Sequence, residues 1–586
     1  MAETVLSGPS VLETDVLVVG GGVAGCLAAL AARGVGAEVL VCDKGGRLAW
    51  SGSVGGGVDQ FLAVLETDEE WDQPAYLMQS VSQLTDGLVD LAVVERMVYE
   101  LPRVFRRIEG LGVNFRDKDA RGYARHRAFG LPGAYHVDFD GKKFKQTIAR
   151  AVRRSGASEL TRCAIVSLFV EDRALAGALG VNIRTGELYA IRAKSCVLAT
   201  GDVNRISRNV ADMPFASWHC PYNTGDAQRM ALSVGGMLAN MEFIEATLGP
   251  TGFSSQGTNA LTGLGAHYLN AAGERFMFKY DPLGERARRS VLVDAVISET
   301  LEGKGPIYLD VRHLPADELA NIERTLEVDR HTVPGFLRQK GVSLAEEPVE
   351  ISISEFSIRR SGVYFRGSGI VIDDAAGADI DGLYAAGDCC TVSAGIAGAS
   401  SLGWIAGQSA AHHAVALGAR PELPADELDS QVAALRGHYE DGRTGSYWDL
   451  EDTVRDTVTR DVGFRRSADG MRRAHGIVAS LAAEEAGLHA VDAHELSRIV
   501  EAQSIREMAE VLVVAAEARE ETRSGSSHYR VDYPEPDERW LKVLGIRKRD
   551  GSYERVTGAP EGPWKDLWKA DAVDRVAAGE GHRVDQ

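Results

Sequence analysis

The stretch from residue 15 to residue 43 restricts the fold of this chain more than any other. An apolar run at 16–19 leads into the glycine turn 20–25 (GGGVAG), a small-residue helix follows, and a second apolar run at 39–42 ends at Asp43. A strand–turn–helix–strand unit of this kind brings a helix N-terminus and bare backbone next to a phosphate. The pattern therefore predicts an α/β domain with a dinucleotide site at this turn.

The parts of this unit have separate expected roles. Gly20 permits the tight turn, Gly22 lets the backbone approach a pyrophosphate, and Gly25 lets helix and strand pack closely. Asp43 lies about 20 residues beyond the glycines, where an acid that bonds a ribose belongs. The alternative is a glycine-rich turn in another kind of α/β domain, which would leave the second strand and its acid without a role.

Length, composition and charge narrow the class of protein. A chain of 586 residues exceeds what one core organises, so about two to four domains are expected. With 45% hydrophobic and 25% charged residues, it has the composition of a soluble globular protein. The net charge of −20 argues against nucleic acid or an anionic membrane as a partner, because nothing would offset phosphate repulsion.

The cysteines predict no metal centre in this chain. There are seven, at positions 26, 42, 163, 196, 220, 389 and 390, and no two are spaced as a CxxC pair. A structural zinc or an iron–sulfur cluster held by this chain is therefore not expected. Scattered cysteines fit a reducing compartment, so we expect a cytoplasmic protein. The apolar stretch 16–42 is flanked by acids and broken by glycines, which favours a nucleotide-binding unit over a membrane span or signal segment.

A second segment repeats the phosphate-site pattern far along the chain. Residues 382–388 (GLYAAGD) form a strand that ends in a glycine–acid pair, and a small-residue helix is expected at 403–416. Between the two segments, residues 142–154 have helical periodicity, and strand-like runs lie at 162–170, 174–184 and 187–199. Two nucleotide-type segments separated in this way predict one binding domain with a large insertion.

The predicted division has four parts. Residues 12–235 and 363–422 form the two pieces of the nucleotide-binding domain, residues 236–362 form an inserted capping or substrate domain, and residues 423–586 form a mainly helical C-terminal domain.

Motifs along most of the chain resemble the succinate dehydrogenase/fumarate reductase flavoprotein superfamily. They are GGGVAG at 20–25, VLATG at 197–201, NTGDA at 223–227, YLNAAGERFM at 268–277, YLDVRHL at 308–314, GLYAAGD at 382–388 and the tail 521–544. The resemblance implies bound FAD and an α/β fold with a Rossmann-like FAD-binding domain, an inserted α+β capping domain and a helical C-terminal domain. Within the superfamily, residues 135–152, 175–201 and the tail look most like the adenylylsulfate reductase alpha subunit.

The turn and the resemblance together assign a set of cofactor-binding residues. These are Gly20, Gly22, Ala24, Gly25, Asp43, Lys44, Ser51, Gly52, Gly55, Gly56, Gly57, Ala164, Thr200, Gly201, Asp226, Gly387, Asp388, Ser400, Ser401 and Leu402. Some relatives attach FAD covalently through a histidine in the loop 51–57. Because Trp50 or Ser51 stands at that place here, we expect non-covalent FAD.

Some residues near the expected flavin have more specific predicted roles. Asp388 is expected to hold the ribityl hydroxyls, and Ser400–Leu402 to precede a helix whose positive N-terminus stabilises reduced flavin. Asp226 is expected near the flavin, with a helix N-cap as the alternative. The neighbouring Cys389 and Cys390 are interpreted as small packing residues, with a redox-active dithiol as the alternative.

The substrate side departs from the family pattern. Histidines that hold a dicarboxylate in fumarate reductases and L-aspartate oxidases are missing from 241–251 and from 355–364, and serines replace the arginine expected at 400–401. Only Arg288 or Arg289 matches the family's proton-donating arginine. We therefore expect neither succinate nor fumarate as the substrate. The resemblance to adenylylsulfate reductase also weakens in the substrate loops, which leaves adenylylsulfate as an alternative.

Four residues are predicted to be catalytic: Trp218, His219, Arg289 and Arg360. Arg127, His136, Arg359 and Arg366 are further candidates for the substrate pocket. Arginine binds anions by bidentate hydrogen bonds, and histidine exchanges protons near neutral pH. The alternative for each is a core histidine or tryptophan, or a surface arginine that faces water.

These observations lead to one main functional hypothesis and two alternatives. The main hypothesis is an FAD-dependent oxidoreductase that moves a hydride or an electron pair between a small substrate, anionic in one version, and flavin. Electrons then pass to a separate ferredoxin-like iron–sulfur protein, and the chain is expected to form an oligomer. One alternative is a stand-alone oxidase or dehydrogenase that uses oxygen or a soluble acceptor. The other is a catalytically inactive flavoprotein that serves as a binding subunit.

Overall fold

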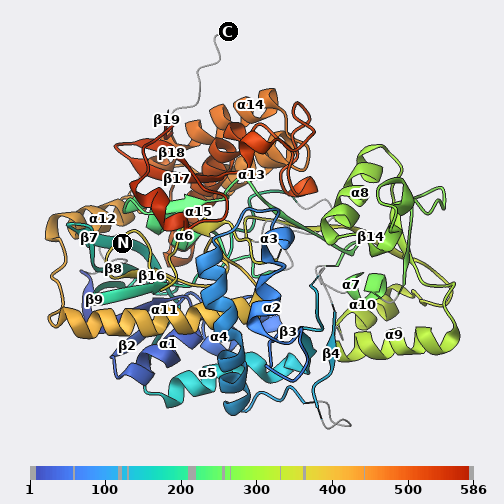
Figure 1. Cartoon of the computed structure of the whole chain (residues 1–586). Helices are drawn as coiled ribbons and strands as arrows, with labels where there is room; N and C mark the ends of the chain where they lie inside the picture. Colours follow the sequence, from blue (N-terminus) through green and yellow to red (C-terminus); the bar gives the residue numbers. More distant parts are fainter. Residues whose placement is uncertain are drawn as a thin grey trace.

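The computed structural model describes residues 8–56, 60–116, 122–127, 131–208, 219–253, 258–263, 265–329, 332–359, 364–440 and 442–579. The strand that precedes the glycine turn belongs to the main sheet, which lies at the left in Figure 1. At the centre, β1 (Ser10–Val19) lies parallel to β2 (Val39–Asp43) on one side and to β9 (Leu188–Leu198) on the other. The full order is β6-β2-β1-β9-β8-β7, with β6 (Ser158–Thr161), β7 (Cys163–Glu171) and β8 (Ala174–Asn182). The strand-like runs predicted at 162–199 are thereby confirmed.

The second glycine–acid segment joins the same sheet. Strand β16 (Leu383–Ala385) pairs in parallel with the end of β9, on the edge of β9 opposite to β1. Helix α11 (Gly395–Leu417) then packs on α1 (Val23–Val35) with backbone touching backbone. A Cβ atom at Gly403 would lie 2.3 Å from the Ala24 carbonyl oxygen, and one at Gly407 would lie 2.1 Å from that of Ala28. Only glycine permits this crossing, which brings the two distant segments together.

Further helices and a small sheet belong to the same part of the chain as the main sheet. The helices are α2 (Pro74–Met78), α3 (Val81–Leu84), α4 (Leu91–Gly110), α5 (Phe144–Arg154) and α6 (Asp226–Ser233). The helix predicted at 142–154 is α5, preceded by one 3₁₀ turn. The small antiparallel sheet consists of β3 (Gln60–Leu62), β5 (His136–Asp138) and β4 (Arg125–His126).

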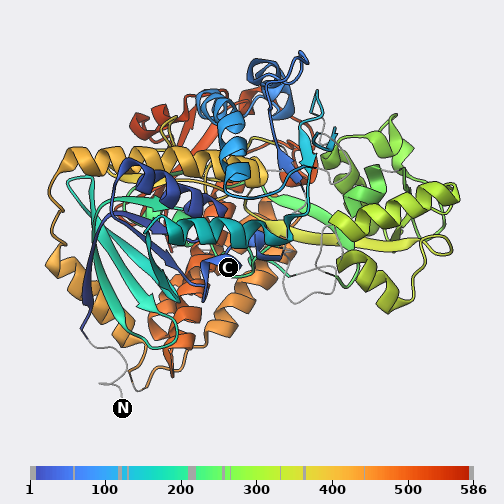
Figure 2. The same ribbon diagram turned by 90° about the horizontal axis from the view of Figure 1, so that it is seen from below.

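The inserted part has its own sheet and its own apolar core. Strands β11 (Glu245–Pro250), β14 (Val349–Ser357), β13 (Ile307–Asp310) and β12 (His267–Leu269) run antiparallel in that order. Helices α7 (Thr258–Gly263), α8 (Arg289–Leu301), α9 (Ala316–Asp329) and α10 (Thr332–Lys340) pack around the sheet. This part stands to one side of the molecule, and the neighbouring β11 and β14 connect it to the rest (Figures 1 and 2).

The C-terminal part is helical with an added sheet. Its helices are α12 (Ala425–Gly437), α13 (Tyr447–Thr457), α14 (Ala468–Ser480) and α15 (Ala493–Ala518). Strands β17 (Val543–Arg549), β18 (Ser552–Gly558) and β19 (Asp574–Ala577) form a five-stranded sheet with β10 (Met237–Ala239) and β15 (Gly369–Ile370). Strands β10 and β15 lie near the two ends of the insertion but belong to the sheet of the C-terminal part, so this sheet crosses the predicted domain boundaries. The division at 236, 363 and 423 stays a proposal. None of the described helices has the length and apolarity that crossing a membrane requires.

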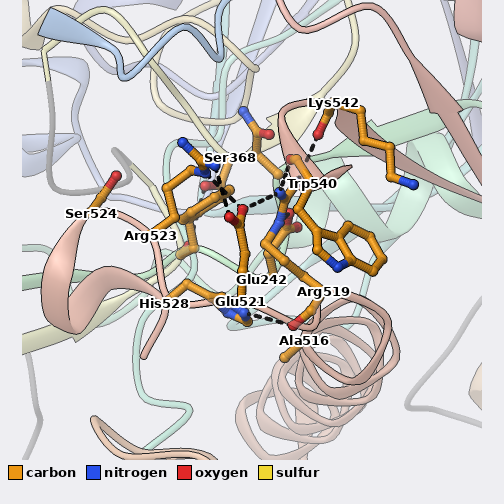
Figure 3. Close-up of polar contacts among 12 residues, drawn as sticks. Glu242, Ser368, Ala516, Arg519, Glu521, Arg523, Ser524, His528, Trp540 and Lys542 are labelled. Atoms are coloured by element: carbon orange, nitrogen blue, oxygen red, sulfur yellow. Dashed lines mark hydrogen bonds and ion pairs between the residues drawn. The ribbon is translucent and has the colours of Figure 1, made fainter. Parts of the chain in front are cut away.

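A buried charge cluster, which we call the hinge cluster, ties these parts together (Figure 3). Arg519 is fully buried, and its Nε lies 2.7 Å from Glu242 Oε1 while its Nη1 lies 2.9 Å from Glu521 Oε1. Arg523 bonds the same Glu521 at 2.7 Å. Glu242 precedes β11, so Arg519 of the C-terminal part binds the chain at the point where it enters the inserted part.

His528 is the neutral member of the hinge cluster. Its Nε2 donates to the Arg519 carbonyl at 3.1 Å, and its Nδ1 accepts from Arg466 at 2.8 Å. Burial and the adjacent guanidinium groups of Arg466 and Arg519 hold the pKa of His528 well below its usual value.

Candidate active site

A cavity of about 1460 Å³ extends from the glycine turn to the inserted part. A single small-molecule site usually measures roughly 300–1,000 Å³, so this cavity has room for a cofactor and a substrate together. Thirteen of the predicted cofactor residues line it: Gly20, Gly22, Ala24, Asp43, Lys44, Ser51, Gly52, Ala164, Thr200, Gly201, Asp226, Gly387 and Asp388.

The glycine turn shows which glycines the protein itself needs. Gly20 has a φ of +99°, and a Cβ there would lie 2.4 Å from the Ala199 carbonyl oxygen. A Cβ at Gly25 would lie 1.9 Å from the Gly20 oxygen, so Gly25 serves the packing of α1 beneath the turn. At Gly22, by contrast, an added Cβ would meet only the Gly52 Cα, at 4.0 Å.

Gly22 therefore provides a test of whether a dinucleotide fits. It is the N-cap of α1, has an ordinary φ of −64° and makes no side-chain cap. Since the polypeptide leaves space there, the bare backbone suits a ligand that approaches the helix N-terminus, as a pyrophosphate does. The residues present at the turn fit FAD.

Asp43 holds the turn and the following loop together. Its Oδ2 accepts from the Gly21 N–H at 2.6 Å, and its Oδ1 accepts from Gly45 N–H and Ser51 Oγ, each at 2.6 Å. Asp43 also lines the cavity, so its carboxylate can be reached by a ribose of the bound cofactor, as the sequence predicts.

Lys44 links the cofactor end to the C-terminal part. Its Nζ lies 2.8 Å from Asp226 and 3.2 Å from Glu501 on α15. Burial alone would lower the pKa of Lys44, but the two carboxylates raise it overall. Helix α6 takes Gly225 as its N-cap, so the alternative N-cap role for Asp226 is wrong.

The second segment places its acid at the middle of the cavity. Gly387 has a φ of +84°, and a Cβ there would lie 3.1 Å from that of Ala24. Asp388 accepts from Ser393 Oγ at 2.6 Å, and its other oxygen lies 3.8 Å from Arg359 Nη1.

The prediction that Ser400–Leu402 precede a helix is wrong. Helix α11 begins at Gly395, because the small residues 395–399 allow it to start earlier, and Ser400 Oγ donates back to the Ile396 carbonyl at 2.6 Å. Ser400, Ser401 and Leu402 are buried and do not line the cavity, whereas residues 394–397 do. We propose that this first turn of α11 takes the predicted role.

His219 lines the cavity and is paired with a buried aspartate, Asp202. His219 Nδ1 donates to Asp202 Oδ2 at 2.6 Å, and both residues are buried. The second Asp202 oxygen accepts from the amides of Asn223 at 2.6 Å and Asn204 at 3.0 Å. Burial raises the pKa of Asp202, but His219 and Arg359 lower it more, so the carboxylate stays ionised.

Arg359 lies at the centre of the charged groups. It is 3% exposed, and its guanidinium lies 2.8 Å from Glu245 and 3.5 Å from Glu355, which belong to the inserted part. It also lies 3.7 Å from Asp202, in the FAD-binding part. Burial works against its charge, but the surrounding carboxylates raise the pKa of Arg359. A permanent cation thus joins the two halves of the cavity.

Arg289 lies next to this group. Its Nη2 is 3.4 Å from Glu245 Oε1, and the residue lines the cavity at the start of α8. Glu245 therefore lies between Arg289 and Arg359. Asp202, His219 and Glu355 present metal-ligand atoms within 4.8 Å of one another, but Arg359 already supplies positive charge there.

The small sheet supplies the opposite wall. His126 Nδ1 lies 3.0 Å from Asp138 Oδ2, His136 Nε2 lies 3.3 Å from Tyr364 OH, and the two imidazoles stack at 5.5 Å. These residues and Arg127 line the cavity.

The other predicted residues lie elsewhere or outside the description. Arg366 belongs to the hinge cluster, where its guanidinium stacks 4.3 Å from the Phe243 ring and donates to Ser524 Oγ at 2.8 Å. Trp218, Arg360 and Gly57 lie outside the described residues, and for Gly55 and Gly56 only the backbone is described. Cys389 and Cys390 are fully buried free thiols with sulfurs 3.8 Å apart, and burial raises the pKa of Cys390.

The sequence did not reveal Asp202, Glu245 and Glu355 as site residues. No local signal marks them, because they meet only when β11 and β14 return beside the loop after β9.

The chain matches two family models and several known proteins. Residues 15–403 match the FAD binding domain, and residues 451–560 match the fumarate reductase flavoprotein C-term. The chain is 30% identical to a fumarate reductase (CoM/CoB) subunit of Methanothermobacter marburgensis, over 92% of this chain and 97% of that protein. It is 27% identical to L-aspartate oxidase of Streptomyces coelicolor, over 92% of each.

Two solved structures have the same fold. Adenylylsulfate reductase from Archaeoglobus fulgidus superposes with a TM-score of 0.84 at 20% identity, covering 95% of this chain and 97% of that one. Quinol fumarate reductase from E. coli superposes with a TM-score of 0.81 at 22% identity, covering 95% of this chain and 98% of that one. The predicted fold class, the superfamily and FAD as cofactor are confirmed.

Proposed function

This chain belongs to the family of FAD-dependent flavoproteins that includes fumarate reductase and succinate dehydrogenase, and we propose that its substrate is a small anion. The proposal depends on one observation above all. Arg289, His219 with its buried partner Asp202 behind it, and the glycine turn belong to one site, because Arg289, His219 and the turn all line the same cavity. A cationic anchor, a proton carrier and the cofactor site are thus in reach of one bound molecule.

FAD supplies a position that accepts or gives a hydride or an electron pair. Arg289 anchors an anionic group of the substrate by paired hydrogen bonds, with Glu245 fixing its orientation at 3.4 Å. The inserted part covers the cavity and limits water around the reacting atoms.

His219 carries the proton in this proposal. Its Nδ1 hydrogen points at the ionised Asp202, so Nε2 is the ring nitrogen that faces the other way. The aspartate fixes the orientation of the ring, and the imidazole gives a proton to the substrate or takes one from it.

We propose that FAD is held without a covalent bond. Ser51 Oγ is engaged by Asp43 at 2.6 Å, and Trp50 has no nucleophilic atom for flavin attachment. Acid precipitation of the purified protein should release all of the yellow cofactor into the supernatant, and colour that stays in the pellet would contradict this point.

The two remaining active alternatives differ in the molecule that accepts the electrons from the flavin. We propose a separate iron–sulfur partner, since the M. marburgensis relative is named as one subunit of its enzyme and the cysteines here are mostly buried and carry no cluster spacing. The second candidate is a stand-alone oxidase, which the L-aspartate oxidase relative supports.

A substrate screen under anaerobic conditions tests the proposal. Small carboxylates, sulfonates and phosphate esters that can donate electrons, succinate and aspartate among them, are mixed with the oxidised protein and flavin bleaching is followed. Candidates that can only accept electrons, adenylylsulfate and fumarate among them, are mixed with the dithionite-reduced protein and the return of the flavin colour is followed. An anion that bleaches wild-type flavin but not that of the Arg289→Met variant is the expected result. Flavin that dithionite reduces, but that no metabolite of the screen reduces or reoxidises, would favour the inactive binding protein. Reoxidation by oxygen alone at the full turnover rate would favour the oxidase.

A further inference from the structure

Lys145 is a buried cation beneath the glycine turn. It lies on α5, is 2% exposed, and does not itself line the cavity. Its ammonium donates to the Gly21 carbonyl at 2.7 Å, to the Leu48 carbonyl at shorter range, and to Cys26 Sγ at 3.4 Å. An ammonium has three donors, so its hydrogen bonding is complete.

All three acceptors of this ammonium are uncharged. Two are carbonyls, and burial raises the pKa of Cys26, which keeps its thiol neutral. Asp43 bonds the N–H of the same Gly21 rather than the ammonium. Among the described residues no carboxylate bonds this ammonium, and a buried charge that lacks a bonded counter-charge is costly for the folded chain.

The cofactor end of the cavity needs positive charge, because a pyrophosphate is an anion. A pyrophosphate at the turn would lie near the Asp43 carboxylate, which repels it. Lys44 is already paired with Asp226 and Glu501. The N-terminus of α1 contributes only about half an elementary charge.

We propose that Lys145 is a positioning residue for the cofactor and provides the counter-charge of its pyrophosphate through the peptide groups of the turn. The inference assumes that the pyrophosphate binds at Gly20–Gly22. By bonding the Gly21 carbonyl, the ammonium polarises the peptide that carries the Gly22 N–H, and Gly22 faces the cavity. By bonding the Leu48 carbonyl, it ties the turn to the loop that carries Ser51 and Gly52.

The proposal predicts opposite effects on the empty and the loaded protein. Without FAD, Lys145→Gln removes a buried charge that no described carboxylate bonds, so the melting temperature of the apoprotein should stay level or rise. Lys145→Met also leaves the Gly21 and Leu48 carbonyls without their donor, so its apoprotein should melt at a lower temperature. With FAD, the melting temperature should gain less on cofactor binding than in the wild type, because binding energy adds to stability. Lys145→Gln keeps amide donors for the two carbonyls, which separates charge from hydrogen bonding.

Calorimetric titration of the apoprotein with ADP and with adenosine completes the test. Both variants should bind ADP and FAD about tenfold or more weakly, the scale of one charged hydrogen bond, while adenosine binding stays unchanged. The exposed neighbour Lys143→Met is the matched control and should behave as the wild type.

Three results would overturn the proposal. They are equal losses of ADP and adenosine binding, a lower apoprotein melting temperature with an unchanged gain from FAD, and unchanged ADP affinity in both variants. Gly22→Ala separates the underlying assumption: if that variant binds ADP normally, the pyrophosphate lies elsewhere and the role of Lys145 fails together with the site.

Discussion

The two ends of the cavity are formed by different kinds of chemical group. The cofactor end consists largely of backbone: one unit of 29 residues supplies the turn, the helix N-terminus and Asp43 (residues 15–43). The substrate end consists of charged side chains, with Asp202, Glu245, Glu355 and Arg359 coming from separate segments. A backbone site depends on the absence of a Cβ, whereas a side-chain site depends on charge. Substitutions at the two ends should therefore fail in different ways.

The largest expected effect is at the substrate end. His219→Asn should slow flavin reduction by the identified substrate about 10²–10⁴-fold, the usual contribution of a general acid or base. The flavin content should stay that of the wild type, because His219 is not part of the glycine turn. Stopped-flow absorbance of the flavin measures the rate. Equal rates in variant and wild type would remove His219 from the chemistry.

The hinge cluster should respond through stability instead. Arg519→Met leaves Glu242 buried without its ion-pair partner and leaves Glu521 with Arg523 alone, and breaking a buried pair of this kind costs about 3–5 kcal/mol of unfolding free energy. Urea unfolding of the holoprotein measures the loss. Arg539→Met is the control, because Arg539 pairs with Asp537 at the surface and its side chain is 81% exposed. Equal losses in the two variants would contradict the structural role of the cluster.

At the cofactor end, Gly22→Ala should weaken FAD binding about 10–100-fold while leaving the fold intact. Each charged hydrogen bond to the pyrophosphate is worth about 1.5–3 kcal/mol, so losing one lowers affinity about 10–100-fold. The added methyl meets no protein atom closer than 4.0 Å, so the apoprotein should melt as the wild type does. Fluorescence titration with FAD measures the affinity.

Gly25→Ala is the matched comparison for Gly22→Ala. Its methyl would lie 1.9 Å from the Gly20 oxygen, so this variant should lose stability even without FAD. If Gly22→Ala destabilises the apoprotein as much as Gly25→Ala does, the open space at Gly22 is not reserved for a ligand.

The smallest expected effect is a pH dependence from His528. Its pKa in the folded protein lies below the ordinary value of 6.5, so the unfolded chain binds the proton first as pH falls. The stability is therefore complete above about pH 6.5 and declines below it by up to about 1.4 kcal/mol per pH unit, until the folded pKa is reached. His528→Asn should flatten the slope of unfolding free energy between pH 7 and pH 5. Parallel slopes for variant and wild type would assign the dependence to other groups.

The difference between the two ends also explains what the sequence could predict. The glycine turn, Asp43 and the strands around them are local, and β16 was recognisable because it repeats their pattern. Glu245 and Glu355 gave no signal, because they lie in ordinary strand sequences and acquire a role only where β11 and β14 meet Asp202. The start of α11 was misplaced because small residues do not mark a helix N-terminus, and Lys145 could not be found because its partners are carbonyls.

The central claim is that FAD and substrate occupy this one cavity, with the pyrophosphate at the turn and the flavin beside the charged groups. A structure of the FAD-loaded protein tests it most directly. The account predicts the pyrophosphate against the N-terminus of α1 and the isoalloxazine within reach of His219 and Arg289. A pyrophosphate away from Gly22, or a flavin ring that does not face His219 and Arg289, would contradict it.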